Sequence, residues 1–329
     1  MIARAIEKPY ISIIIPTHNS ASTLEHTIAA CLTQDYPRDR FEILVVDDGS
    51  KDNTKKIVEN FPVTYIYQKK TGPASARNNG WKNSKGDGLC FIDADCVPYS
   101  DWVSKLVEGY HEDDVGAVTG SYAVDGLQYL LDKFVHCEIK YRHSMRLEYV
   151  NSFGTYNVLV KRSVFENLKG FDPLYFNASG EDSDLSYRII KSGYKIYFAK
   201  GALVSHRNIL RFWRYILVQF NHGYWRMRLY RKNISMITKD EYGYWKDFAE
   251  LSLIIALIVS IVIDFQNKSL LIGLLIAPLF AIQLLFPVKL SLEEKDARHL
   301  VFSFVTFIRG FARVLGGIVG FVVFWIIRK

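Results

Sequence analysis

Residues 41–50 read FEILVVDDGS, an apolar run that stops at two aspartates followed by a glycine and a serine. Such a run is typical of a strand that is buried on both faces of a parallel sheet. Comparable runs occur at residues 11–15, 63–67 and 89–92, and segments with helical patterns lie between them. Alternating strands and helices predict an α/β domain whose mostly parallel sheet carries helices on both faces.

Acidic residues stand where two of these runs end. Asp47 and Asp48 follow the second run, and Asp93 and Asp95 follow the fourth. Ligands of open α/β sheets bind beyond the carboxyl ends of the strands. Carboxylate oxygens suit Mg²⁺ or Mn²⁺, which neutralises the charge of a leaving diphosphate. Asp93-Ala94-Asp95 is therefore a candidate metal site, although such a triplet alone is equally compatible with a solvated loop.

Further elements follow from local patterns. Ser22 to Glu25 has the spacing of a capping box and predicts a helix through about Leu32. We also expect helices over about 126–145 and 181–193, and a strand near 153–160. The four cysteines lack metal-ligand spacing, so we expect free thiols in a reducing compartment.

Residues 207–232 contain seven Arg and Lys residues, no acidic residue and many aromatics. Apolar residues recur there at helical spacing, which predicts an amphipathic helix at a membrane interface: Leu210, Trp213, Leu217, Phe220 and Tyr224. A basic and aromatic surface for nucleic acid is the rival interpretation. The apolar segments that follow favour the membrane.

Two apolar runs, 251–263 and 270–288, predict a helical hairpin in the bilayer. A third run, 301–327, is broken by Arg309 and Arg313, which we expect at the cytoplasmic interface. The rival interpretation of this region is a buried helical core. A net charge of +7 and a pI near 9.0 favour contact with an anionic membrane surface. Residues 1–10 lack the apolar stretch of a signal peptide, so we expect the soluble part in the cytoplasm.

Several motifs occur in the order found in the family 2 glycosyltransferases, which have the GT-A fold. The chain resembles this family over about residues 10–208, through segments that the sequence places as follows: SIIIPTHN at 12–19, EILVVDDGSKD at 42–52, GPASARN at 72–78, DAD at 93–95, GFD at 170–172 and GEDSDL at 180–185. The resemblance implies a GT-A domain at 1–206. Basic interface helices would follow at 207–246, and a transmembrane region of two to three helices at 247–329.

The resemblance also implies roles for individual residues. The donor nucleotide would be bound by residues of the first three motifs and the metal triplet: Pro16, Thr17, Asn19, Asp47, Asp48, Arg77, Asn78 and Asp93. Within this set Asp48 would hydrogen-bond the base. Asp95 would ligate the metal together with Asp93 and His206, although a structural histidine at a strand end is the rival interpretation of His206. Asp182 would be the general base, with Glu181 beside it as a second catalytic residue.

These roles predict an inverting glycosyltransferase that depends on Mn²⁺ or Mg²⁺. It would transfer sugar from a UDP- or GDP-sugar to a hydroxyl of a lipid-linked saccharide, on the cytoplasmic side of a multi-pass membrane protein, with no nucleic-acid partner. The family's Gln-x-x-Arg-Trp motif for processive synthesis is absent after Gln219, which disfavours polymer synthesis. Two alternatives stay open: transfer onto a polyprenyl phosphate, and a non-catalytic scaffold that binds sugar nucleotides.

Overall fold

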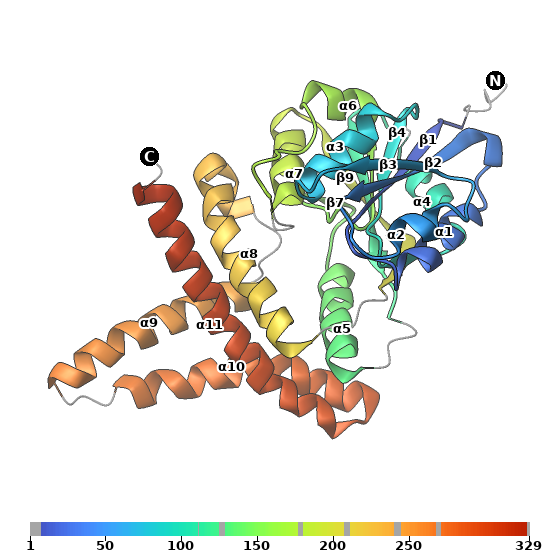
Figure 1. Cartoon of the computed structure of the whole chain (residues 1–329). Coiled ribbons are helices and arrows are strands. Elements are labelled where there is room, and N and C mark those ends of the chain that lie inside the picture. Colours follow the sequence, from blue (N-terminus) through green and yellow to red (C-terminus); the bar gives the residue numbers. More distant parts are fainter. Residues whose placement is uncertain are drawn as a thin grey trace, which may run out of the picture. The chain divides into compact units, whose positions relative to one another are not determined.

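A computed structural model describes residues 8–110, 112–124, 129–176, 180–206, 211–239, 245–267 and 271–327. The chain forms two compact units (Figure 1). The first combines Met1–Gly126 with Lys140–Asn208, and the second combines Leu127–Ile139 with Ile209–Lys329. The segment 127–139 thus belongs with the C-terminal helices, whereas the sequence placed it within the domain 1–206.

The first unit is built on a nine-stranded sheet in the order β3-β2-β1-β4-β8-β6-β9-β5, with β7 paired to β9. Its strands are β1 (Ile11–Thr17), β2 (Phe41–Asp48), β3 (Thr64–Gln68), β4 (Gly88–Phe91), β5 (Cys96–Pro98), β6 (Val115–Tyr122), β7 (Tyr149–Val150), β8 (Val158–Lys161) and β9 (Lys195–His206).

The parallel arrangement predicted for the first four strands is confirmed. Strand β1 runs parallel to both β2 and β4, and β2 runs parallel to β3. Every residue of β1 is buried, as a strand covered on both faces requires. The rest of the sheet is mixed, because β8 runs antiparallel to β4 and β6. The carboxyl ends of β1, β2 and β4 therefore share one edge, where the predicted donor residues follow.

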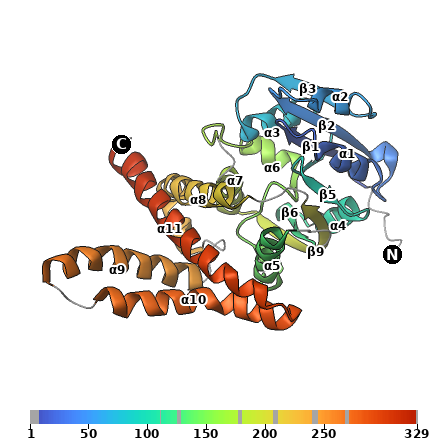
Figure 2. The same ribbon diagram turned by 60° about the horizontal axis from the view of Figure 1, so that its bottom comes forward.

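Helices cover both faces of this sheet (Figures 1 and 2). Helices α3, α6 and α7 pack their apolar residues on one face, in a core with Ile14, Val46 and Phe91. The helices of this unit are α1 (Leu24–Leu32), α2 (Thr54–Val58), α3 (Pro73–Lys82), α4 (Trp102–Glu108), α6 (Arg162–Asn167) and α7 (Glu181–Lys191), with a 3₁₀ turn, η1, at Arg38–Arg40.

Two local predictions are corrected. The capping box is not formed: α1 begins at Leu24, and the hydroxyl of its N-cap residue Thr23 donates to the Ser20 carbonyl at 3.4 Å instead. The strand expected from residue 153 begins at Val158, because the Phe153 N–H donates to Ser186 Oγ of α7 rather than to a neighbouring strand. The helix expected over 126–145 is α5 (Leu130–Ser144), and residues 125–128 lie outside the described part of the chain.

The second unit consists of helices: α8 (Phe212–Lys232), η2 (Ile234–Lys239), α9 (Trp245–Asn267), α10 (Leu271–Glu294), η3 (Ala297–Val301), α11 (Phe302–Phe321) and η4 (Val322–Ile327), with the first part of α5. Helices α9 and α10 lie side by side, as the predicted hairpin requires (Figure 2). By length and composition, two of the described helical segments are apolar enough to cross a membrane, Ile272–Glu294 and Ala297–Ile327.

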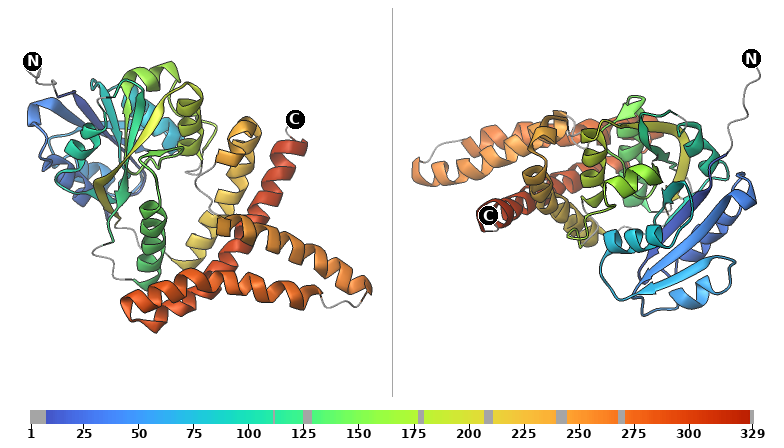
Figure 3. Two further views of the ribbon diagram at one scale, coloured as in Figure 1. Left: turned by 180° about the vertical axis from the view of Figure 1, so that it is seen from behind. Right: turned by 90° about the horizontal axis from the view of Figure 1, so that it is seen from above.

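Helices α8 and α11 lie alongside each other at very close range (Figure 3). A Cβ added to Gly316 would meet the carbonyl oxygen of Phe220, and one added to Gly320 would meet that of Tyr224. This Gly-x-x-x-Gly spacing is typical of helix packing in membranes, where small residues let two backbones approach. The predicted lipid-facing stripe of α8 is thus divided: Phe220 and Tyr224 pack against α11, while Trp213 and Leu217 stay exposed. Leu210 lies outside the described residues.

The two arginines expected at the membrane interface are used inside the helical unit. Arg309 is buried and donates to both carboxylate oxygens of Glu138, at 2.5 and 3.1 Å, and to the Tyr215 hydroxyl. Arg313 donates to Gln219 at 2.8 Å and to Asp247 at 3.2 Å. These partners come from α5, α8 and α9, far away in sequence, and the position of the two arginines relative to a membrane stays a prediction.

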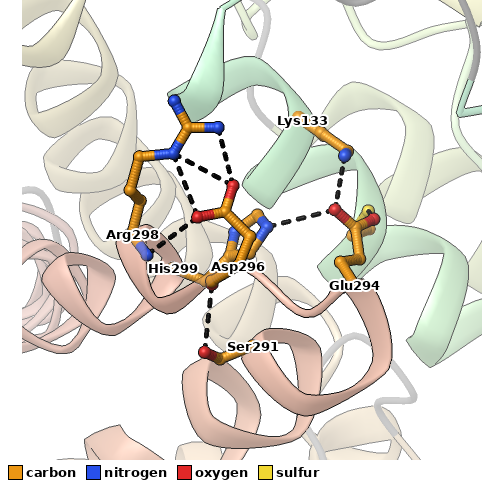
Figure 4. Close-up of polar contacts among 7 residues, drawn as sticks. Lys133, Ser291, Glu294, Asp296, Arg298 and His299 are labelled. Atoms are coloured by element: carbon orange, nitrogen blue, oxygen red, sulfur yellow. Dashed lines mark hydrogen bonds and ion pairs between the residues drawn. The ribbon is translucent and has the colours of Figure 1, made fainter.

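A second charged cluster joins α5 to the turn between α10 and α11 (Figure 4). Glu294 accepts from Lys133 of α5 and, at 3.1 Å, interacts with His299 Nε2. Asp296 caps η3 by accepting from the Arg298 N–H and also binds the Arg298 guanidinium. These contacts secure the chain reversal between the two apolar segments.

Within the first unit, the Asn157 side chain links three elements that the sequence does not connect. Its Oδ1 accepts from Trp102 Nε1 at 2.7 Å, and its Nδ2 donates to the carbonyls of Ser121 and Ala202 at 3.0 and 2.9 Å. Asn157 is fully buried. One side-chain amide therefore hydrogen-bonds to strands β6 and β9 and to helix α4.

We expect Asn157→Ala to destabilise this part of the sheet by about 2 to 4 kcal/mol, because it leaves a buried indole N–H without an acceptor and two carbonyls without this donor. Amide hydrogen exchange of peptides from β6 and β9 measures the effect in the full chain. The exposed helix-end variant Asn83→Ala should leave exchange there unchanged. Equal exchange in the two variants would contradict the role of Asn157.

Candidate active site

The loop after β1 is fixed to the end of β2. Pro16 and Thr17 are the last, buried residues of β1. Asn19 adopts a left-handed backbone with φ of 53°, and its N–H donates to Ser50 Oγ while its Oδ1 accepts from the Lys51 N–H, both at 2.8 Å. Asparagine tolerates this conformation better than most residues. The predicted nucleoside loop is thus preformed.

The two aspartates of β2 organise the loops around them. Asp47 accepts from the Ser50 N–H and from the Tyr65 hydroxyl, each at 2.8 Å. Asp48 accepts from the backbone N–H groups of Thr71 and Gly72, again at 2.8 Å. These bonds hold the segment that leads into α3. The predicted contact of Asp48 with the base would share oxygens that already accept from the backbone.

Glycine is required where this segment enters α3. Gly72 is the N-cap of the helix, and its φ of 98° is one that L-residues rarely adopt. A Cβ there would also collide with the carbonyl of Phe176. Further along the same helix, Asn78 binds the Phe171 backbone through both ends of its side-chain amide, donating to the Phe171 carbonyl at 2.8 Å and accepting from the Phe171 N–H at 2.9 Å. Asn78 thereby joins the donor segment to the GFD motif.

Arg77 connects the metal motif with the acidic helix start. Its guanidinium donates to Asp93 Oδ1 at 2.7 Å and to Glu181 Oε1 at 3.0 Å. Burial opposes the charge of Arg77, but Asp93 and Glu181 hold its pKa above the ordinary value. Residues 16 and 104 positions away in sequence are thus brought to one buried cation, and the Asp93 side chain, 37% exposed, is the solvent-accessible member of this group.

The residues at the ends of β4 and β9 form a candidate metal centre. His206 Nε2 lies 3.4 Å from Asp95 Oδ2, and Cys96 completes a group whose ligand atoms lie within 4.8 Å of one another. The pairing of β5 with β9 sets Cys96 opposite His206. Burial raises the pKa of the Cys96 thiol well above its ordinary value. A neutral thiol is a poor ligand, so carboxylate and imidazole are the donors that suit Mn²⁺ here.

The first turn of α7 carries three acidic residues with different surroundings. Glu181 is buried in the ion pair with Arg77, and Asp184 is buried and accepts from Arg188 Nε at 2.8 Å. Asp182 is half-buried and accepts from the Ser183 N–H at 2.7 Å. Asp182 is therefore the most exposed acid of this turn. Glu181, which we predict to be catalytic beside Asp182, is bound to Arg77.

An aromatic pair near these acids was missed in the sequence. Tyr122 and Tyr156 stack with ring centroids 4.0 Å apart, and Tyr122 also meets the His206 ring edge to face at 6.1 Å. Burial raises the pKa of Tyr156, and nearby carboxylates, including Asp182, raise it further. Single tyrosines on separate elements form no motif, so no signal in the sequence could have found them.

Comparisons with known proteins agree with this geometry. The glycosyl transferase family 2 model matches residues 12–168, and a model described as the N-terminal domain of galactosyltransferase matches residues 135–211. The probable glycosyltransferase YdaM of Bacillus subtilis is 32% identical over 219 residues, which are 60% of this chain and 50% of that protein. Glycosyltransferase AglE of Haloferax volcanii is 32% identical over 209 residues, which cover 60% of this chain and 67% of AglE. The chain thus spans about half of YdaM and two thirds of AglE.

Solved structures share the fold. The mannosyltransferase PcManGT of Pyrobaculum calidifontis, in complex with GDP-Man and Mn²⁺, superposes with a TM-score of 0.63 at 22% identity, covering 92% of this chain and 88% of its own. GalNAc-T7 with UDP, GalNAc and Mn²⁺ gives a TM-score of 0.51 at 22% identity, with coverages of 62% and 44%. The ordered motifs, the sheet topology and these matches lead to one conclusion: the chain belongs to glycosyltransferase family 2 and has the GT-A fold.

Proposed function

We propose that this glycosyltransferase is an inverting, metal-dependent enzyme. It would transfer one sugar from a UDP- or GDP-sugar to a hydroxyl group of a lipid-linked saccharide, at the cytoplasmic face of a membrane. The proposal extends the family assignment to the donor, the acceptor and the roles of named residues.

The observation that carries the proposal is the position of Arg77 between Asp93 and Glu181. The metal motif belongs to the donor side, and Glu181 is the neighbour of Asp182. One guanidinium binds both carboxylates, at 2.7 and 3.0 Å. The proposed donor side, at Asp93, and the proposed acceptor side, at Glu181 and Asp182, are therefore connected through Arg77. A base must come within hydrogen-bond reach of the proton it accepts.

In the proposed reaction the acceptor hydroxyl oxygen attacks the anomeric carbon of the donor. The bond from that carbon to the diphosphate oxygen breaks, and its electron pair leaves with the nucleoside diphosphate. The hydroxyl proton passes to Asp182. A single displacement of this kind inverts the configuration at the anomeric carbon, through an oxocarbenium-like transition state.

Asp95 and His206 would hold the divalent ion, with Asp93 facing the donor beside it. A bound Mn²⁺ or Mg²⁺ would neutralise the negative charge of the leaving diphosphate. Arg77, paired with two carboxylates, would orient Asp93 rather than bind phosphate. Tyr122 and Tyr156 would exclude water from the side of His206.

The acceptor is inferred from the helical unit. Two segments are apolar enough to cross a membrane, and exposed aromatic and basic residues of α8 suit a lipid interface. The net charge of +7 favours the anionic cytoplasmic leaflet. A saccharide carried on a lipid at this face is the acceptor class that such a surface would meet.

The proposed activity is tested with a panel of UDP- and GDP-sugars and Mn²⁺, scored by release of nucleoside diphosphate. We expect release to require a lipid-linked saccharide. Equal release with polyprenyl phosphate alone would instead support transfer onto phosphate. A chain that binds a donor but releases no nucleoside diphosphate with any acceptor would be a binding scaffold.

Asp182→Asn should lower turnover by about 100- to 10,000-fold, because the amide cannot accept the hydroxyl proton. Donor affinity, measured by titration with Mn²⁺ present, should stay unchanged because Asp182 lies on the acceptor side. Asp39→Asn, at an exposed position, serves as the control. Turnover of Asp182→Asn near that of the control would exclude Asp182 as the base.

Asp95→Ala and His206→Ala should each weaken donor binding at least tenfold in the presence of Mn²⁺, since each removes a proposed ligand. Chelation of the metal should bring the unaltered protein to the same weak binding. If His206→Ala binds the donor as the unaltered protein does, His206 is a structural residue at the strand end.

A further inference from the structure

The helical unit contains a cavity of about 150 Å³ between α8, α9 and α11. This volume is several times the space that one water molecule requires. Its lining is unusual for an apolar helical unit, because charged and apolar side chains both reach it: Arg226, Arg313, Asp247, Glu250, Phe248 and Leu251. The cavity lies wholly within the helical unit.

Gly317 lines this cavity where the helix backbone leaves open space. Its neighbours Gly316 and Gly320 are explained by the approach of α8, whose carbonyls would collide with any Cβ there. A Cβ on Gly317 would meet nothing within 4 Å, and Gly317 lines the cavity. Glycine costs about 1 kcal/mol relative to alanine inside a helix. Helix packing does not explain why glycine stands at position 317. A ligand in the cavity would explain it, because a larger side chain would take up the space of that ligand.

Basic groups converge on one wall. His222, Arg226 and Arg313 all line the cavity. Burial, and then the charges of Arg313 and Arg226, lower the pKa of His222 to about 3. The histidine is therefore neutral. The lining carries two guanidinium groups, and it also carries the carboxylates of Asp247 and Glu250. Arg313 shares its charge with Asp247 at 3.2 Å. Arginine is well suited to phosphate oxygens, which it binds with paired N–H groups.

Glu250 adds a carboxylate to the lining of the cavity. It is 3% exposed and lines the cavity, and among the described residues neither of its carboxylate oxygens has a hydrogen-bond donor. Lys246 and Arg309 interact with Glu250 electrostatically, but a buried carboxylate oxygen without a hydrogen-bond donor still costs free energy. A ligand with hydroxyl groups beside its phosphate would supply such donors. Phe248 and Leu251, 49% and 44% exposed, continue the lining onto the apolar surface of α9.

We propose that this cavity binds the phosphate-bearing headgroup of a membrane lipid, whose hydrocarbon chain lies along the apolar surface of α9. The phosphate would accept from Arg226 and Arg313, and Glu250 would accept from a hydroxyl of the headgroup. The inference deepens the proposed function and rests on it, because it gives the lipid-linked acceptor a phosphate next to a long hydrocarbon chain.

The test uses the full chain in detergent and farnesyl phosphate as the probe, with binding measured by calorimetric titration. We expect saturable binding of farnesyl phosphate and at least tenfold weaker binding of farnesol and of inorganic phosphate. Equal binding of inorganic phosphate would show an anion site without a lipid, and equal binding of farnesol would show an apolar surface only. Either result overturns the proposal.

Gly317→Leu should fill the cavity and reduce farnesyl phosphate binding at least tenfold without disturbing the α8–α11 contact. Gly273→Leu on α10 is the matched control, because a Cβ there also meets nothing within 4 Å and lies outside the cavity. Arg226→Gln should weaken binding about tenfold, with exposed Arg214→Gln on the same helix as its control. Unchanged binding by Gly317→Leu would overturn the proposed site.

Donor binding with Mn²⁺ separates this inference from the proposed function, since no donor residue lies in the cavity. If Gly317→Leu and the unaltered protein bind the donor equally while neither binds farnesyl phosphate, the cavity proposal fails and the proposed function stands. If farnesyl phosphate binds in a Gly317-dependent way but no donor binds, the cavity proposal stands and the proposed function fails.

Discussion

The buried guanidinium of Arg77 is the constraint on which the catalytic unit depends. A cation that is 2% exposed is stable only where carboxylates surround it. Asp93 and Glu181 meet that need, and in doing so they fix where β4 ends relative to where α7 begins. The metal motif and the acidic start of α7 are thereby held to one buried side chain.

The sequence predicted well what local pattern determines. Apolar β-branched runs gave β1 to β4, their parallel pairing and the edge where acidic residues follow. The sequence could not predict which side chains hydrogen-bond to residues far away along the chain. Asp48 is bound by the backbone of residues 71 and 72, and Glu181 by an arginine 104 positions earlier. Tyr122 and Tyr156 meet only because β6 and the segment before β8 are adjacent. Secondary-structure propensity and hydrophobic periodicity carry no information about such long-range contacts.

The helical unit shows the same contrast in another setting. Its hydropathy predicted apolar helices and a hairpin, and both are present. The interrupting charges are paired inside the unit: Arg309 with Glu138 and Tyr215, Arg313 with Gln219 and Asp247. In a membrane, an apolar side chain is about equally stable against lipid and against another helix. Small residues and polar contacts therefore determine how helices associate there. The glycine contacts of α8 with α11 and these arginines together specify the arrangement.

Helix α5 has a consequence for dissecting the protein genetically. Its first part belongs to the helical unit, where Phe134 stacks on Phe302 at 4.2 Å and Glu138 binds Arg309. The rest of the helix belongs to the catalytic unit. A stop codon after residue 206 would therefore not release an intact soluble domain, since it would expose an aromatic ring and a carboxylate that the missing half normally covers. The gene encodes two units that are interleaved, and neither corresponds to a single uninterrupted stretch of codons.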